Sequence, residues 1–583
     1  MLGLVLKPRP VASPVLGGRA IPNQWDAIAF VLVAALLVLA VQGSRGMTAP
    51  LSAPVTVDLS LDYLNLPYYA LRTTLRMFAA IVFSLIFTFV YATIAAKSRR
   101  AEMVMIPLLD VLQSVPVLGF LSFTVAFFLG LFPGSTLGAE CAAIFAIFTG
   151  QAWNMAFSFY QSLRTVPRDL EEVARGFGLS GWQKFWQLET PFAMPGLIWN
   201  TMMSMSGGWF FVVASEAISV GDTTIKLPGI GSYLALAIDA KRIDCVVAAV
   251  VAMAIVILAY DQLIFRPIVA FSDKFRVEMT ASQTTARSFV RDLFARTRWL
   301  RQAVRVPAGF LRRAALWRLE PPADLGRLTA ALPVQSRLLD IVWYAVVFAA
   351  TAYGAWLVYA FVSASLGFSD VVEAVGLTVV TMIRVFLLIV LATLFWVPVS
   401  VWIGLRPAVA EKVQPLAQFL AAFPANVLFP VAVVGVIRFS LNPDIWLSLL
   451  VVFGTQWYIV FNVIAGATAY PNDLREVAAN FRIGGWDWWR KVILPGVFPY
   501  YVTGALTASG GSWNATIVAE YVKWGDDKVS AHGIGAYIAK ATDAGDYPRI
   551  VLGVCVMSVF VILFNRLLWR PLFAYGERKL CLS

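Results

Sequence analysis

The sequence is nearly free of histidine and poor in cysteine. Among its 583 residues the single histidine is His532, and the four cysteines, Cys141, Cys245, Cys555 and Cys581, are scattered without a CxxC pair. Histidine-based triads and zinc sites need several such side chains at short spacing. We therefore expect no metal site, and cysteines that behave as small apolar residues.

Nucleotide-binding and catalytic motifs are missing as well. The sequence contains no G-x4-G-K-[ST] phosphate-binding loop, and no nucleophile elbow or pair of carboxylates stands out in its apolar segments. The chain is therefore not expected to hydrolyse ATP by itself or to act as an enzyme. We expect no cofactor on this chain.

Charge is scarce: 14% of the residues are charged, whereas 59% are hydrophobic. A soluble protein carries roughly a quarter charged residues, so this balance indicates an all-α polytopic membrane protein. The first apolar segment is interpreted as a retained helix, because the lead before it is long for a signal peptide. We predict about twelve transmembrane helices, six per half, with a short third helix in each half. They are Trp25–Val41, Phe78–Ala96, Val117–Leu131, Leu137–Phe159, Gly196–Ile218, Cys245–Phe265, Ile341–Phe361, Val375–Ile403, Val427–Val436, Trp446–Ala467, Val497–Ala519 and Ile550–Leu568.

The net charge of +12 is concentrated in a polar, arginine-rich stretch, residues 271–336, between the sixth and seventh predicted helices. The positive-inside rule places this stretch in the cytoplasm, and both termini with it. We interpret it as a linker that contacts membrane lipid, rather than as a nucleic-acid site. The predicted domains are residues 1–270, 271–336 and 337–583.

The two halves are copies of each other. A register of 304 residues holds without a gap from Gly150/Gly454 to Pro267/Pro571, and a register of 308 pairs Arg76 with Arg384 further upstream. Because each copy has an even number of predicted helices, both copies should enter the membrane in the same direction. Parallel repeats of this kind occur in transporters, with a solute pathway between the halves.

One charged segment occurs twice between the fourth and fifth helices of the halves. It reads EEVARGFGLSGWQKFWQLETP from Glu171 to Pro191 and REVAANFRIGGWDWWRKVILP from Arg475 to Pro495. Each copy should form a helix, a turn and a second helix on the cytoplasmic side. One interpretation is an interfacial helix resting on headgroups; the other, favoured by the acidic residues, is a docking element for a soluble partner.

The spacing E-x-A-x3-G-x12-P resembles the EAA loop of binding-protein-dependent ABC importer permeases. In the first copy its residues are Glu172, Ala174, Gly178 and Pro191. The second copy matches it at three positions, Glu476, Ala478 and Pro495. There Arg482 stands in place of the glycine, and we expect Gly484 to supply the turn instead.

Three further stretches resemble the nitrate/sulfonate/taurine-type branch of this family: PLLDVLQSVPVLGF, PGIGSYLALA and LLWRPLF. The resemblance implies a type I importer fold that takes up a small oxyanion, a sulfonate or a related metabolite through a bacterial inner membrane. It also implies two cytoplasmic ABC ATPase subunits, which would bind ATP and Mg, and a periplasmic or lipid-anchored solute-binding protein.

Polar residues inside apolar segments are candidates for the solute pathway. Arg76 and Arg384 match near the outer start of the second helix of each half, and Glu216 and Glu520 match near the outer end of the fifth. They form either a charged ring that guides an anion or, the interpretation we favour, an Arg–Glu pair within each half. Asn154 and Asn514 are further candidates. A secondary transporter driven by an ion gradient, or a membrane scaffold, remains an alternative function.

Overall fold

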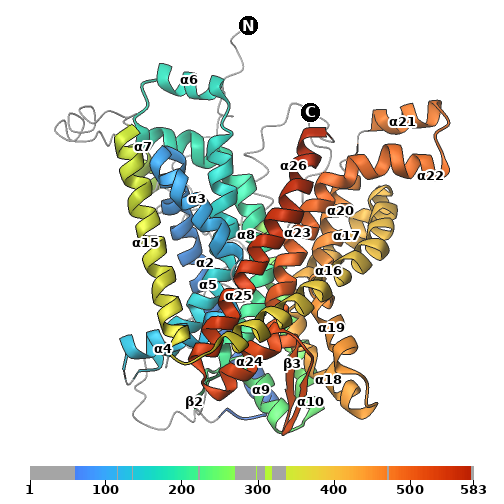
Figure 1. Ribbon diagram of the computed structural model, residues 1–583. Helices are drawn as coiled ribbons and strands as arrows, with labels where there is room; N and C mark the ends of the chain where they lie inside the picture. Colours follow the sequence, from blue (N-terminus) through green and yellow to red (C-terminus); the bar gives the residue numbers. More distant parts are fainter. Residues whose placement is uncertain are drawn as a thin grey trace, which may run out of the picture.

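The computed structural model describes residues 59–268, 297, 309–317 and 337–579, apart from 115, 134, 221, 222, 311, 469 and 471. The described residues form helices and two short β-hairpins (Figure 1). The first half contains η1 (Tyr63–Asn65), α2 (Leu66–Lys97), α3 (Arg99–Ser114), η2 (Val117–Phe120), α4 (Leu121–Leu131), α5 (Thr136–Arg164), α6 (Arg168–Gly176), α7 (Gly181–Lys184), η3 (Phe185–Glu189), α8 (Thr190–Glu216), β1 (Ala217–Val220), β2 (Thr223–Lys226), α9 (Ile230–Asp239), α10 (Ile243–Tyr260) and η4 (Asp261–Phe265).

The second half repeats this order after α15 (Arg337–Ser363), whose predicted counterpart in the first half, Trp25–Val41, lies outside the described residues. Each strand pair, β1–β2 and β3–β4, is antiparallel. The repeated elements are α16 (Phe368–Gly404), α17 (Pro407–Ala422), η6 (Ala425–Val427), α18 (Phe429–Arg438), α19 (Pro443–Phe453), α20 (Gln456–Thr468), α21 (Asn472–Asn480), α22 (Gly485–Trp488), η7 (Trp489–Ile493), α23 (Leu494–Ala519), β3 (Tyr521–Trp524), β4 (Asp527–Ser530), α24 (Ile534–Ala544), α25 (Tyr547–Phe564), η8 (Asn565–Trp569) and α26 (Arg570–Lys579).

The halves differ at one long helix. In the first half α5 is continuous over 29 residues, whereas its counterpart is divided into α19 and α20, which are bent by 40° at Gly454-Thr455. Gly454 lies so close to Ala425 that an added Cβ would come within 2.7 Å of the alanine Cβ. The bend therefore belongs to a tightly packed crossing of α19–α20 with η6.

Six helices of the described residues are long and apolar enough to cross a membrane, or seven if α19 and α20 form one broken span. Of the predicted helices, Trp25–Val41 lies outside the described residues, and each of the others coincides with a helix or a pair of helices. Helices α5 and α8 have sufficient length but are less apolar, because polar residues such as Gln151 are buried between them and α2. The result is a multi-pass α-helical membrane protein.

The predicted third helix of each half is short in the structure, as the sequence indicates. Val117–Leu131 and Val427–Val436 form only short helices, whereas the preceding 16-residue helices α3 and α17 lead back from the ends of α2 and α16. Charged residues such as Arg99, Glu102 and Glu411 mask the apolar character of these helices in the sequence. A helix of 16 residues is about 24 Å long, which is shorter than the hydrocarbon core, and neither α3 nor α17 is among the candidate spans of the described residues.

The core of each half is a packed helical trio, α2–α5–α8 in the first and α16–α20–α23 in the second. The halves meet reciprocally: η2 contacts α23 and α25, and η6 contacts α8 and α10. Figure 1 shows α6 and α21 at one end of the molecule and α9, α24 and the hairpins at the other. The two repeats therefore run in the same direction, as the sequence predicts.

Candidate functional site

The first copy of the charged segment folds into two short helices that meet at a tight turn. Helix α6 follows Pro167 and has Asp169 and Glu171 in its first turn, where carboxylates favour the positive end of a helix. It ends in a Schellman-type turn, in which the Leu179 amide donates to the Ala174 carbonyl at 3.2 Å and Gly178 has φ +62°. Helix α7 then begins with a capping box.

The second copy makes the same turn without glycine, which corrects our expectation. Helix α21 ends at Asn480, and the Ile483 amide donates to the Ala478 carbonyl at 2.9 Å. Arg482 itself adopts the left-handed conformation, with φ +52°, whereas Gly484 is extended. The hydrogen-bond pattern of the turn thus fixes the left-handed position four residues after the alanine in both copies, and the glycine at 484 has no part in it.

The residues of the E-x-A motif have distinct environments. Ala174 and Ala478 are buried, whereas Glu172 and Glu476 are exposed. Large apolar side chains are exposed beside them, including Phe177 in the first copy and Phe481 in the second. Each copy therefore presents a carboxylate and an aromatic ring together on the outside of the bundle, and exposed aromatic rings are enriched in protein interfaces.

Each short helix pair is joined directly to a long helix of the bundle. A π-helical turn, η3 or η7, connects α7 to α8 and α22 to α23, with Pro191 and Pro495 in the first turn of the long helix. Lys184 on α7 bonds Glu171 on α6 at 2.7 Å. This hydrogen bond holds the pKa of Glu171 below its ordinary value. The first helix pair is therefore fastened internally and should move with α8 as one body.

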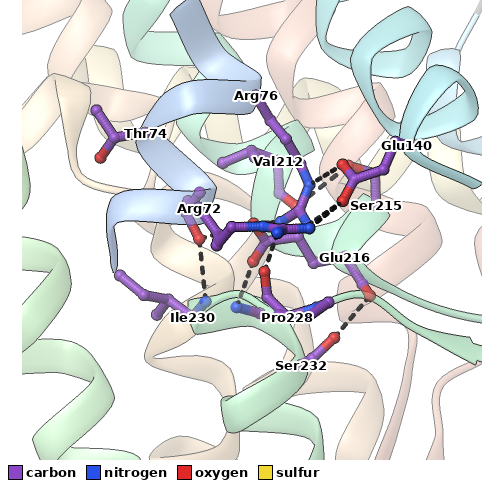
Figure 2. A network of polar contacts seen from close by, with 12 residues as sticks. Arg72, Thr74, Arg76, Glu140, Val212, Ser215, Glu216, Pro228, Ile230 and Ser232 are labelled. Carbon is purple, nitrogen blue, oxygen red and sulfur yellow. Dashed lines mark hydrogen bonds and ion pairs between the residues drawn. The ribbon is translucent and has the colours of Figure 1, made fainter. Parts of the chain in front are cut away.

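At the opposite end of the first half, the predicted Arg76–Glu216 pair forms part of a buried ionic network (Figure 2). The Arg76 guanidinium donates to Glu216 at 2.7 Å and to Glu140 at 2.6 Å, and Arg72 donates to Glu140 at 2.8 Å. Arg76 and Glu216 are fully buried. Two cations and two carboxylates thus join α2, α5 and α8.

The glycines of the repeated Gly-Ile-Gly motif make room for this network. The Gly231 amide donates to Glu216 at 2.7 Å, at the N-terminus of α9. A Cβ on Gly229 would lie 2.2 Å from the Glu216 carboxyl carbon, and one on Gly231 would collide with the Val213 carbonyl. Close approach of the backbone, rather than a special φ, therefore explains both glycines.

The second half contains the same network in a more open form. Arg384 donates to Glu520 and lies 3.4 Å from Asp444, the counterpart of Glu140. Val380 stands at the position of Arg72. His532, at the position of Pro228, bonds Asp444 through its ring nitrogen at 2.9 Å and is largely exposed. In both halves, therefore, the predicted Arg and Glu are paired within the half, and the polar atoms of Arg76 and Glu216 face each other rather than a pathway.

A small cavity of about 70 Å³ lies between the halves. Its lining comes from α8, from the α17–α18 region, from the bend between α19 and α20, and from α23. Asn514, Thr455 and Tyr458 supply polar groups, and Phe210, the counterpart of Asn514, lies opposite in the lining. The lining contains no lysine, arginine, aspartate or glutamate. Asn154 is absent from it and instead accepts a hydrogen bond from Gln113 at 2.7 Å.

The sequence interpretation missed Arg72, Glu140 and Asp444. A signal for two of them exists, because Glu140 and Asp444 are 304 residues apart, the register used further downstream. Arg72 lies one helical turn before Arg76, so that the two guanidinium groups occupy the same face. Extending the repeat upstream would therefore have predicted a second carboxylate partner in each half.

These features define a multi-pass membrane protein built from two copies of one helical bundle around a shared cavity. A family model described as "Binding-protein-dependent transport system inner membrane component" matches residues 88–266 and 396–568, which together are more than half of the chain. The protein belongs to this family and contains its domain twice.

The curated relatives are permeases of similar sequence. The chain is 28% identical over 178 residues to a nitrate import permease protein of Leptolyngbya laminosa and 30% identical over 177 residues to a bicarbonate transport system permease protein of Synechococcus elongatus. Each match spans 30% of this chain and 60% of the relative. A putative aliphatic sulfonates transport permease protein of Escherichia coli is 28% identical over 159 residues, which are 27% of this chain and 55% of the relative.

Proposed function

We propose that this chain is the membrane permease of an ATP-driven importer and supplies both halves of the solute pathway. The observation that carries the proposal is the pair of exposed E-x-A elements at one end of the molecule, each continuous with a helix that lines the cavity between the halves. A partner that moved α6 and α21 would thereby move α8 and α23.

The expected partners follow from this geometry and from the family. Two ABC ATPase subunits, which carry the ATP and Mg, would dock on α6–α7 and α21–α22. A periplasmic or lipid-anchored solute-binding protein would deliver the solute at the opposite end, near α9 and α24. In this proposal α6 and α21 lie in the cytoplasm, and the chain lies in a bacterial inner membrane.

The size and the lining of the cavity favour a small, polar solute. Its neutral polar groups are the Asn514 amide and the Thr455 and Tyr458 hydroxyls. Such groups can donate hydrogen bonds to an anion without the strong attraction of a buried cation. Weak contacts allow the solute to leave as well as to enter. Nitrate, bicarbonate and small sulfonates, which the names of the relatives mention, fit this description, and taurine belongs to the same class.

Docking is tested by reversing the exposed carboxylates. The Glu172→Lys and Glu476→Lys double variant should lose an ATPase that co-purifies with the unaltered chain, because each change places a cation where the partner expects a carboxylate. Asp526→Lys, an equal charge change on an exposed residue of the β3–β4 turn at the other end, should retain the ATPase. Retention by the double variant would argue against these elements as the docking site.

The rival function is a secondary transporter driven by an ion gradient. Coupling to an ion requires ionisable groups along the pathway, whereas the described lining of the small cavity offers none apart from Tyr458. A larger adjoining cavity between the halves, of about 350 Å³, is lined by Asp261 and Arg266, but these two residues form an ion pair with each other at 3.4 Å. Uptake of nitrate or bicarbonate into proteoliposomes that contain the permease, the ATPase and the binding protein should require ATP and persist with ionophores. Uptake without ATP that collapses with the ion gradient would favour the rival.

A further inference from the structure

The described linker residues 309, 310 and 312–317 pack against the first docking element, and we call them the linker strap. The Trp182 indole donates to the Ala314 carbonyl at 2.8 Å, and the Gln183 side chain donates to the Leu316 carbonyl at 2.9 Å. Both donors belong to α7. The strap is therefore held by two specific hydrogen bonds in addition to its covalent connection to the two halves.

The second docking element cannot hold the strap in this way. The counterpart of Gln183 is Asp487, a carboxylate that bonds Lys491 at 3.2 Å and cannot donate to a carbonyl group when ionised. The counterpart of Trp182 is Trp486, which is 73% exposed. The difference between Gln183 and Asp487 therefore explains why the strap binds to the first element.

The strap exposes a mixed apolar and basic surface. Phe310 is 66% exposed and Trp317 is 55% exposed, and Arg312 and Arg313 are exposed between them. Exposed aromatic and arginine side chains are the residues that contribute most to protein interfaces. Helix α6 of the same element exposes the acidic residues Asp169 and Glu172 and the basic residues Arg168 and Arg175. The combined surface is therefore mixed in charge and fits a protein partner better than a uniformly anionic layer of headgroups.

We propose that the linker strap is part of the first ATPase-docking site, so that this site binds an ATPase subunit more tightly than the second. The strap adds Phe310, Trp317 and two arginines to the surface of α6 and meets an acidic and apolar patch on the ATPase. This inference rests on the proposed function, in which ATPase subunits dock on both elements.

The test compares chains in which one docking element at a time is disabled. The ATPase that co-purifies with the unaltered chain is titrated onto full-length Glu476→Lys and Glu172→Lys variants in nanodiscs of zwitterionic lipid. We expect about tenfold tighter binding to Glu476→Lys, which retains the first element and its strap. Adding Trp317→Ala to Glu476→Lys should remove this advantage.

A matched pair of variants probes the attachment of the strap. In the Glu476→Lys background, Gln183→Asp should weaken ATPase binding to the level of the second element, because it gives the first element the acidic residue of the second. Asp487→Gln in the Glu172→Lys background should leave the affinity unchanged, since no strap is tethered beside it. Circular dichroism and the melting temperature would confirm that each variant is folded.

The outcomes separate this inference from the function on which it rests. If no ATPase co-purified with the unaltered chain, both the inference and the function would be overturned. Equal affinities of the two single-element chains, with binding retained, would overturn only the role of the strap. An advantage that appears in nanodiscs containing phosphatidylglycerol but not in zwitterionic ones would assign the strap to lipid and also overturn it.

Discussion

The ionic networks at the hairpin end of the two halves occupy matching positions of the repeat but differ in how far they are exposed to solvent. In the first half Arg76 is fully buried, and two arginines bond Glu140. In the second half the Arg384 side chain is 9% exposed, Asp444 is 39% exposed, and His532 is 82% exposed. The second arginine, the longer carboxylate side chain and the proline have each been replaced, whereas the backbone carbonyl at the proline position accepts from the central arginine in both halves.

The difference concerns charge balance as well as exposure. The first network contains Arg72 and Arg76 against Glu140 and Glu216, whereas the second contains Arg384 alone against Asp444 and Glu520. Because a buried, balanced network is hard to open and a hydrated, unbalanced one is easier, we expect the second half to separate first at this end.

The largest test of this comparison removes the central arginine of each network. Arg76→Ala leaves the two buried carboxylates with Arg72 as their one remaining cationic partner. This variant should therefore lose about 3–5 kcal/mol of stability. Arg384→Ala should cost less, about 1–3 kcal/mol, because water reaches Asp444 and His532. Thermal unfolding of the two variants in detergent measures both losses. Equal losses would show that the difference in exposure has no energetic consequence.

The turns of the two docking elements give a second, smaller contrast. Gly178→Arg should destabilise the first turn by about 1 kcal/mol, because a side chain disfavours the left-handed conformation. Arg482→Gly should relieve a similar strain, with part of the gain offset by the greater freedom of glycine in the unfolded chain. Chemical denaturation compares the variants, with Gly176→Ala as a control, since Gly176 lies in open space and has no positive φ.

Restoring the missing arginine should make the networks more alike. Val380→Arg places a second guanidinium beside Asp444, as Arg72 lies beside Glu140, and should stabilise the second half by about 0.5 kcal/mol because the pair is partly exposed. If opening begins there, transport should also slow. A higher melting temperature with unchanged uptake would support the charge pairing but contradict the order of opening.

The smallest expected effect is a pH dependence at the first docking element. Lys184 lowers the pKa of Glu171, so the ion pair stabilises the folded state above the ordinary pKa of a glutamate and loses this contribution as the pH falls through the lowered value. Glu171→Gln should therefore cost about 0.5 kcal/mol at pH 7 and almost nothing in strong acid. Melting temperatures across this range measure the difference. A constant difference at all pH values would rule out the ion pair as its source.

Much of the architecture could be predicted from the sequence because each feature of the repeat occurs in both halves at matching positions. The repeat register located both E-x-A elements, and the matched Arg76 and Glu216 indicated a pair within the half. Features that depend on three-dimensional contacts could not be predicted. Charge concealed the helix α3, and Arg482 takes a glycine conformation because the hydrogen bonds of the turn demand it.

The bend at Gly454-Thr455 has a consequence for how such a protein can evolve. In a permease assembled from two identical chains, a kink in one wall of the channel must also appear in the other. Here the described residues show the kink in one half, whereas the counterpart helix of the other half, α5, is continuous. Joining the two halves in one polypeptide has released them from enforced symmetry, so one wall can be shaped for the cargo while the other preserves the frame.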